Sequence, residues 1–313
     1  MSVATKIGTR LIRITNALIN FSLLLIILLL LAFGCYTVWD SGQVYGAASF
    51  SRYEKFKPTT EDGGKSFEDL QAINPDVFAW LTVYGTNIDY PIVQGKDNIK
   101  YVNTSAEGRH SLSGAIFLDY RSSSDFSDFS SILYGHHMET ATMFGEIGLF
   151  HENTYFSARK YGTLYYGGKE HGLEFFAFVH ADAYDGSVFR VKVTDEDEKQ
   201  EYLDLLAKIA MHTRGDVPVT IDDRIVLLST CSSNSTNGRD ILVGKITQTV
   251  HDNPFVLEQP NNPVAIPVID ELSDSWTNAD LPIKIGVVAL LLSLILLLIL
   301  VICRKKKSNK GDE

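Results

Sequence analysis

A thiol and a guanidinium in the last third of the chain have the spacing of two groups that a turn could hold together. Residues 224–230 form a β-prone run that stops at Cys231, and Arg239 stands just before the next such run, residues 241–247. In a hairpin, the end of one strand and the start of the next come close together. A nearby positive charge favours the thiolate, which is the nucleophilic form of cysteine. On this segment alone, a buried structural cysteine beside an exposed loop arginine remains the alternative.

A histidine follows another β-prone run in a similar way, in Tyr134-Gly135-His136-His137-Met138. The glycine lets the chain turn or approach another backbone. Histidine moves protons near neutral pH, and a Cys–His couple can form an ion pair that activates sulfur. The alternative is a surface loop histidine. A metal site at the histidine pair is disfavoured, because adjacent residues rarely point at one ion and no helical His-x-x-x-His or Cys-x-x-Cys accompanies them.

The elements that must position these residues are mostly strands. Short β-prone runs separated by turn residues are typical of an antiparallel barrel or sandwich. The predicted strands cover residues 77–83, 88–93, 114–118, 131–134, 173–181, 224–229 and 241–247. A short helix is expected from Ser66 to about residue 73, and residues 195–212 have the apolar spacing of one amphipathic helix inserted between strands.

Two uncharged runs bracket this strand-rich region. Residues 14–39 and 285–303 span about 39 Å and 28 Å as helices, against roughly 30 Å for the hydrocarbon core of a bilayer. Basic residues precede the first run and follow the second, so the positive-inside rule predicts two transmembrane helices with both termini cytoplasmic. The alternative for the first run is a cleaved signal peptide, with Ala47-Ala48-Ser49 as a weak candidate site.

Composition limits the remaining possibilities. The 313 residues carry 28 Lys+Arg against 38 Asp+Glu, a formal net charge of −10, which argues against a nucleic-acid binder. The three cysteines are too few for a disulfide framework. Cys35 and Cys303 fall in the apolar runs, so Cys231 is alone in the exported region. An unpaired thiol in an oxidising setting is a liability unless it is buried or used.

The expected domain organisation follows the chain in order. It comprises a cytoplasmic basic segment (1–13), a transmembrane helix (14–39), a stalk (40–65), an extracellular catalytic domain (66–255), a linker (256–284), a second transmembrane helix (285–303) and a cytoplasmic basic tail (304–313).

Several motifs in the same order resemble those of a known family. Leu228-Ser229-Thr230-Cys231 with downstream Arg239 resembles the signature of sortases, the membrane-anchored cysteine transpeptidases of Gram-positive bacteria. The histidine motif and the Met143-Phe144-Gly145 that follows it also look like theirs. Residues 73–81, 87–95 and 114–120 are similar to class B sortases in particular. The resemblance covers roughly residues 66–250.

The resemblance implies a fold and a set of residue roles. The fold is the eight-stranded sortase barrel, closed, with an N-terminal helical stretch and one inserted amphipathic helix. Cys231 would be the nucleophile, His136 the general acid/base and Arg239 the group that binds the developing oxyanion. Ser229 and Thr230 would help to line the substrate groove. No metal or organic cofactor is expected for this reaction.

The implied reaction cleaves an LPxTG-like sorting signal through a thioacyl-enzyme intermediate and transfers the acyl group to an amine. Class B members usually have only an N-terminal anchor, whereas a second, C-terminal membrane segment is more typical of sortases that polymerise pilins. We therefore expect a pilin lysine to be the acceptor. The alternative is attachment of surface proteins to the peptidoglycan cross-bridge, and the alternative of another class is a non-enzymatic surface receptor or adhesin.

Overall fold

The computed structural model describes residues 3–58, 64–138, 141–231 and 237–255; the side chain of Cys231 is outside this description. The second predicted transmembrane helix (285–303) lies outside the described residues, as do the predicted linker (256–284) and basic tail (304–313).

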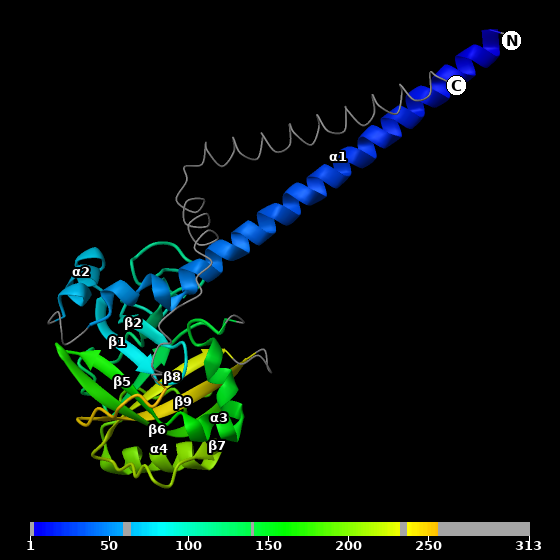
Figure 1. The fold of residues 1–313 in the computed structure, drawn as a ribbon. Coiled ribbons are helices and arrows are strands. Elements are labelled where there is room, and N and C mark those ends of the chain that lie inside the picture. Colours follow the sequence, from blue (N-terminus) through cyan, green and yellow to red (C-terminus); the bar gives the residue numbers. More distant parts are fainter. Residues whose placement is uncertain (1–2, 59–63, 139–140, 232–236, 256–313) are drawn as a thin grey trace. The chain divides into compact units, whose positions relative to one another are not determined.

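Within the described residues, eight strands form a closed barrel (Figure 1). Their hydrogen-bonded order is β5-β1-β2-β3-β4-β8-β9-β6, and β6 pairs with β5 to close the ring, while β7 adds to β6 as a ninth strand. The strands are β1 (Val77–Val83), β2 (Asp89–Val93), β3 (Ile116–Leu118), β4 (Ser130–Tyr134), β5 (Tyr161–Tyr166), β6 (Lys169–Asp182), β7 (Ala210–Thr213), β8 (Arg224–Cys231) and β9 (Gly238–Thr247). The predictions of a mostly-β fold and a closed barrel are confirmed, and all seven predicted strands are present.

Strand β5 is one of two that the sequence analysis missed. It joins β6 through a turn at Gly167-Gly168, where both residues have positive φ (59° and 73°) and Tyr166 pairs with Lys169. A type I′ hairpin turn requires positive φ at both central residues, which glycine adopts without strain. The Gly-Gly pair between two β-prone runs was therefore the signal for this hairpin.

The amphipathic helix is present but shorter than predicted. Helix α4 (Glu196–Ile209) begins after Asp195, whose side chain accepts from the amides of Asp197 and Glu198. The last residues of the predicted helix instead form β7, which extends the edge of β6. Backbone pairing with that edge outweighs the helical spacing of the side chains, so the prediction of helix through residue 212 was wrong.

The strands bury side chains on both faces. On β8, Val226 and Leu228 join the core inside the barrel, whereas Ile225 and Leu227 join a second apolar cluster. The second cluster includes Tyr202, Leu203 and Leu206 of α4, so this helix covers the outer face of β8 and β9. The alternation places neighbouring residues of one strand in two different environments.

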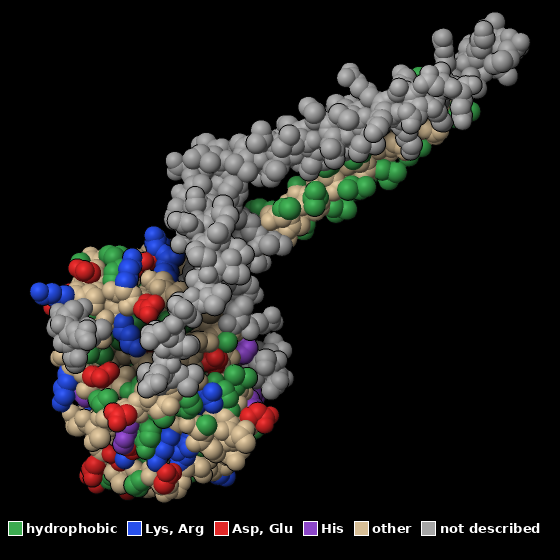
Figure 2. Space-filling view, viewed as in Figure 1, with side chains coloured by type: hydrophobic (Ala, Val, Ile, Leu, Met, Phe, Trp, Pro, Cys, Tyr) green, Lys and Arg blue, Asp and Glu red, His purple; other side chains and the backbone are tan. Residues whose placement is uncertain are grey.

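The N-terminal region contains one long helix, α1 (Val3–Ala48). Its segment Ile14–Thr37 has a mean hydropathy of 2.7 and is long and apolar enough to cross a membrane. Figure 2 shows hydrophobic side chains along its visible face. At its end Ala48 is buried, and the carbonyl of Ala48 accepts a hydrogen bond from Tyr90 Oη at 2.9 Å.

Short helices connect α1 to the barrel and its strands to one another. They are η1 (Phe50–Arg52), η2 (Glu54–Phe56), α2 (Lys65–Ile73), η3 (Lys100–Val102), η4 (Gly145–His151) and α3 (Asn153–Ala158). Tyr53 and Phe56 join the barrel core, and Phe67 and Leu70 of α2 pack there as well. The helix expected from Ser66 is therefore confirmed, beginning one residue earlier.

Candidate active site

The hairpin of β8 and β9 brings the predicted thiol and guanidinium positions together. Cys231 is the last residue of β8, and the antiparallel register pairs it with Arg239, the second residue of β9. The loop between them includes residues 232–236, which are outside the described part of the chain. Opposed residues of an antiparallel pair have Cβ atoms about 4.5–5.5 Å apart and on the same face of the sheet.

The histidine motif reaches the same place from the other side of β8. Strand β4 runs parallel to β8, with Tyr134 paired to Ser229, and the amide of Gly135 donates to the carbonyl of Ser229 at 3.2 Å. His136 stands two residues after Tyr134, as Cys231 stands two residues after Ser229. Three neighbouring strands thus bring these two positions and Arg239 to one edge of the barrel.

A glycine before the histidine is required by packing. A Cβ on Gly135 would lie 2.6 Å from Ile116 Cδ1 and 2.7 Å from Phe144 Cδ2. Both contacts are closer than side chains tolerate, so any other residue would push the chain away from the barrel. His136, the next residue, would move with it.

The ring of His136 is held by a backbone carbonyl. Its Nε2 lies 2.8 Å from the carbonyl oxygen of Val102, at the end of η3. A carbonyl can only accept, so Nε2 carries the proton in this contact and Nδ1 is the nitrogen left to exchange one. His136 is half-buried and lines the groove described next, whereas its neighbour His137 is not among the described residues that line it.

A groove of about 610 Å³ runs beside these strand ends. It is larger than the hollows around Asp223 (about 440 Å³) and around Tyr166 (about 460 Å³). Of the residues predicted for the site, His136, Ser229, Thr230 and Arg239 line it. The hydroxyls of Ser229 and Thr230 are buried without a hydrogen-bond partner among the described residues. This wall of the groove therefore has hydroxyl groups that can still form hydrogen bonds.

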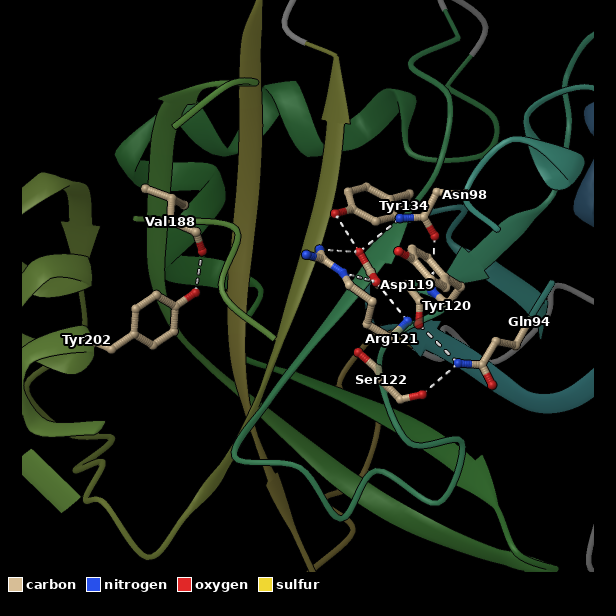
Figure 3. A network of polar contacts seen from close by, with 9 residues as sticks. All are labelled: Gln94, Asn98, Asp119, Tyr120, Arg121, Ser122, Tyr134, Val188 and Tyr202. Carbon is tan, nitrogen blue, oxygen red and sulfur yellow. Dashed lines mark hydrogen bonds and ion pairs between the residues drawn. The ribbon is translucent and has the colours of Figure 1, made fainter. Parts of the chain in front are cut away.

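One wall of the groove rests on a polar network that the sequence analysis missed. Asp119, directly after β3, accepts from Arg121 Nε and Nη2 (both 2.8 Å), Asn98 Nδ2 (2.9 Å) and Tyr134 Oη (3.2 Å), as Figure 3 shows. Arg121, Asn98 and Tyr134 all line the groove. The side-chain amide of Gln94 ties the same loop through the carbonyls of Asp119 and Ser122.

Burial and the hydrogen bonds of this network determine the protonation states of Asp119 and Tyr134. Burial raises the pKa of the Asp119 carboxyl, but its hydrogen bonds to Arg121 and Asn98 and the charge of Arg121 lower it by more. The net pKa of Asp119 is therefore below its usual range, and the group is ionised at neutral pH. Burial and the adjacent Asp119 raise the pKa of Tyr134, so its phenol stays protonated and donates. Asp119 lies in the segment 114–120, whose similarity to class B sortases gave no role to this residue.

The chain matches no protein-family model, but it is similar to characterised proteins. Sortase B of Listeria monocytogenes is 31% identical over 199 residues, which are 62% of this chain and 80% of that protein.

Solved structures agree with this similarity. Sortase B from the type II pilus of Streptococcus pneumoniae is 47% identical with a TM-score of 0.52, over 58% of this chain and 99% of that one. A class B sortase of Streptococcus pyogenes involved in pilus biogenesis is 42% identical with a TM-score of 0.53, over 57% of this chain and 97% of that one. With its closed barrel and apolar N-terminal helix, the chain belongs to the sortase B family and is a sortase transpeptidase.

Proposed function

We propose that Cys231 is the nucleophile of this transpeptidase, His136 its general acid/base and Arg239 its oxyanion-binding residue. The observation that carries the proposal is the register of three adjacent strands. Cys231 is paired with Arg239 on one side, and on the other side His136 continues the strand that is paired with Ser229. A positive charge beside a cysteine favours the thiolate, and a histidine within reach can exchange protons with the reacting groups.

In the acylation step, the thiolate attacks the carbonyl carbon at the scissile peptide bond of a sorting signal. The electron pair of the C=O bond moves to oxygen, and the guanidinium of Arg239 stabilises the resulting charge. When the tetrahedral intermediate collapses, the C–N bond breaks and His136, as imidazolium, protonates the leaving amine. The contact of Nε2 with Val102 occupies that proton, so Nδ1 delivers the one transferred.

In the second step, an amine attacks the thioester carbon and His136 accepts the proton that the amine loses. Collapse of the second intermediate expels the thiolate of Cys231 and forms the new amide bond. Arg239 acts on the same oxygen in both steps. Removing one such donor typically costs about 10²–10³ in rate, so Arg239→Ala should slow both half-reactions by that order.

The substrate is an LPxTG-like sorting signal, and the acceptor is a pilin lysine. Support comes from the two pilus-associated sortases, which are 47% and 42% identical to this chain. It also comes from the predicted topology, with helices at 14–39 and 285–303, both termini cytoplasmic and the catalytic domain extracellular. The apolar segment Ile14–Thr37 of α1 is consistent with the first of these anchors.

The test combines the full chain in detergent micelles with a pilin subunit that carries an LPxTG-like signal. The expected product is a ladder of covalent pilin oligomers that Cys231→Ala and His136→Ala abolish. His137→Ala is the matched control, because His137 is the neighbour of His136 in the same motif and should be dispensable for transfer. Acyl transfer only to cross-bridge peptides would refute the pilin acceptor, and activity that survives Cys231→Ala would refute the nucleophile.

A further inference from the structure

A second cluster of polar side chains lies behind the hairpin, on the face of β9 opposite to Arg239. Along β9, Ile241 and Val243 contact the apolar cluster under α4, whereas Leu242 joins the barrel core. Asp240 is on the same face as Leu242, opposite to Arg239, and it is not among the described residues that line the groove. It is therefore separate from the proposed catalytic residues, although it is one residue from Arg239.

Two histidines from different elements converge on this carboxylate. His180 is the register partner of Asp240 on β6, and its Nδ1 lies 2.8 Å from Asp240 Oδ1. His151, the last residue of η4, brings its Nε2 to 3.0 Å from the same oxygen. The three ligand atoms lie within 4.8 Å of one another. Among the described residues, this is the one group of three or more His, Cys, Asp or Glu side chains close enough to share an ion.

The carboxylate of Asp240 is buried, and only one of its two oxygens has hydrogen-bond partners among the described residues. The side chain of Asp240 is 1% exposed, and both imidazoles donate to Oδ1. Its Oδ2 is buried and has no hydrogen-bond partner among the described residues. A buried charge with an unpaired oxygen is costly, so a further positive partner would stabilise it. The side chains of His151 and His180 are 23% and 34% exposed, which gives a cation a way in from solvent.

The ring of His137 also lies near Asp240, on the other side of the space at Gly148. The ring of His137 has a buried Nδ1 without a partner among the described residues. Its Cε1 lies 3.6 Å from the position that a Cβ on Gly148 would take, and Asp240 Oδ2 also lies 3.6 Å from that position. Gly148 therefore leaves space between two groups that each lack a partner.

We propose that Asp240, His151 and His180 form a site for a divalent transition-metal ion of the Zn²⁺ class. Two imidazole nitrogens and one carboxylate oxygen are a donor set that Zn²⁺ and related ions accept, whereas Mg²⁺ and Ca²⁺ prefer oxygen ligands throughout. Zn–N and Zn–O distances are about 2.0–2.2 Å, so a small inward movement of the rings would bring these atoms around one ion.

Metal binding changes where the protons sit. In the hydrogen-bonded arrangement, His151 Nε2 and His180 Nδ1 both carry a hydrogen, since the carboxylate only accepts. To coordinate, each neutral ring moves that hydrogen to its other nitrogen, and a doubly protonated ring releases one proton. The ion would join η4, β6 and β9 through side chains that do not line the groove, so its role would be to stabilise the barrel, not to enter acyl transfer.

The test is a calorimetric Zn²⁺ titration of the chelator-treated full chain in detergent, repeated with Co²⁺ while its visible absorption is recorded. One equivalent should bind, and the melting temperature should rise with the metal. His180→Ala and Asp240→Asn should each weaken binding by more than about 100-fold, since even outer-shell partners of metal ligands contribute about 10–100-fold. His171→Ala is the matched control: this buried histidine stacks on Tyr166, away from the cluster, and its loss should leave the affinity unchanged.

Two outcomes would overturn the proposal. One is the absence of saturable binding in the parent chain, or binding that both His180→Ala and Asp240→Asn leave unchanged. The other is binding that disappears with Cys231→Ala, because the ion would then depend on the thiol of Cys231. His180 is partly exposed at the barrel surface, so His180→Ala should fold, and its far-ultraviolet circular dichroism checks this.

Discussion

Asp119 and Asp240 are both excluded from solvent, one beside the groove and the other behind it, yet their oxygens are used differently. Both oxygens of Asp119 are engaged by Arg121, and Asn98 and Tyr134 add two further donors. Asp240 receives two imidazole nitrogens on one oxygen and no described partner on the other.

The difference indicates that Asp119 is a structural residue whose hydrogen bonds are complete, whereas Asp240 belongs to a site that lacks a partner. For a carboxylate with several fixed donors and an adjacent guanidinium, these interactions offset much of the free-energy cost of desolvation. The carboxylate in turn holds the donors in place. Asp119 therefore defines the position of the groove wall. When one buried oxygen of a carboxylate has no partner, the desolvation cost is not fully offset. Such a group is stabilised by any cation that can reach it. The following substitutions test this contrast.

The largest effect is expected from Asp119→Ala. It leaves the guanidinium of Arg121 and the phenol of Tyr134 without their acceptor inside the groove wall. Breaking a buried pair typically costs 3–5 kcal/mol, and the side chain of Arg121 is 45% exposed, so water replaces part of the loss. We expect the free energy of unfolding, measured with urea, to fall by about 3 kcal/mol, with lower kcat/KM. An unchanged unfolding curve would show that the network contributes nothing.

A smaller, pH-dependent effect is expected from Asp119→Asn. The folded pKa of Asp119 is lowered, chiefly by Arg121 against the opposing effect of burial, so its stabilisation is present above the unfolded pKa of about 3.9. It is lost as the pH falls through the folded value, because the unfolded chain binds the proton first. Unfolding free energies measured from pH 6 to pH 3 should therefore decline less steeply in Asp119→Asn than in the parent. Parallel curves would contradict this.

Tyr134→Phe should have a still smaller effect. It removes one hydrogen bond to Asp119 at 3.2 Å and leaves the ring, which packs against Phe117 and Phe189. A hydrogen bond to a charged group contributes about 1.5–3 kcal/mol, but Asp119 keeps four shorter bonds, one of them from the backbone amide of Arg121 at 3.0 Å. We therefore expect a loss of about 1 kcal/mol in urea unfolding. Tyr155→Phe, a tyrosine outside the groove, is the control, and equal losses would mean that the groove network has no special role.

The sequence predicted local elements better than long-range neighbours. Strand β1 (Val77–Val83) has the predicted bounds because β-prone residues stand between clear turn signals. The Cys231–Arg239 pairing was expected because a hairpin joins residues that are close in sequence. The parallel pairing of β4 with β8, which brings His136 to the same edge, is not encoded in local periodicity. The chemistry of the two side chains suggested a Cys–His couple, but only the family resemblance placed the histidine in the same site as the cysteine.

The two buried carboxylates show the same limit. Asp119 follows a strand and looks like a turn residue. Arg121 is a local donor to it, but the other two side-chain donors come from distant segments, around Asn98 and Tyr134. Asp240 sits between Arg239 and an apolar run, and its histidine partners lie on β6 and η4. Neither environment can be predicted before the barrel order is known, because each depends on which strands are neighbours.

The smallest effect is expected from Asp240→Asn in metal-free protein. The amide oxygen still accepts from His151 and His180, while the buried charge and its unpaired oxygen disappear. Losing charge-assisted bonds and losing a desolvated charge oppose each other, so the unfolding free energy should change by less than about 1 kcal/mol. The measurement is urea unfolding with a chelator present, beside Asp119→Ala. A loss as large as that of Asp119→Ala would mean that Asp240 is already a complete anchor, and the contrast between the two carboxylates would be wrong.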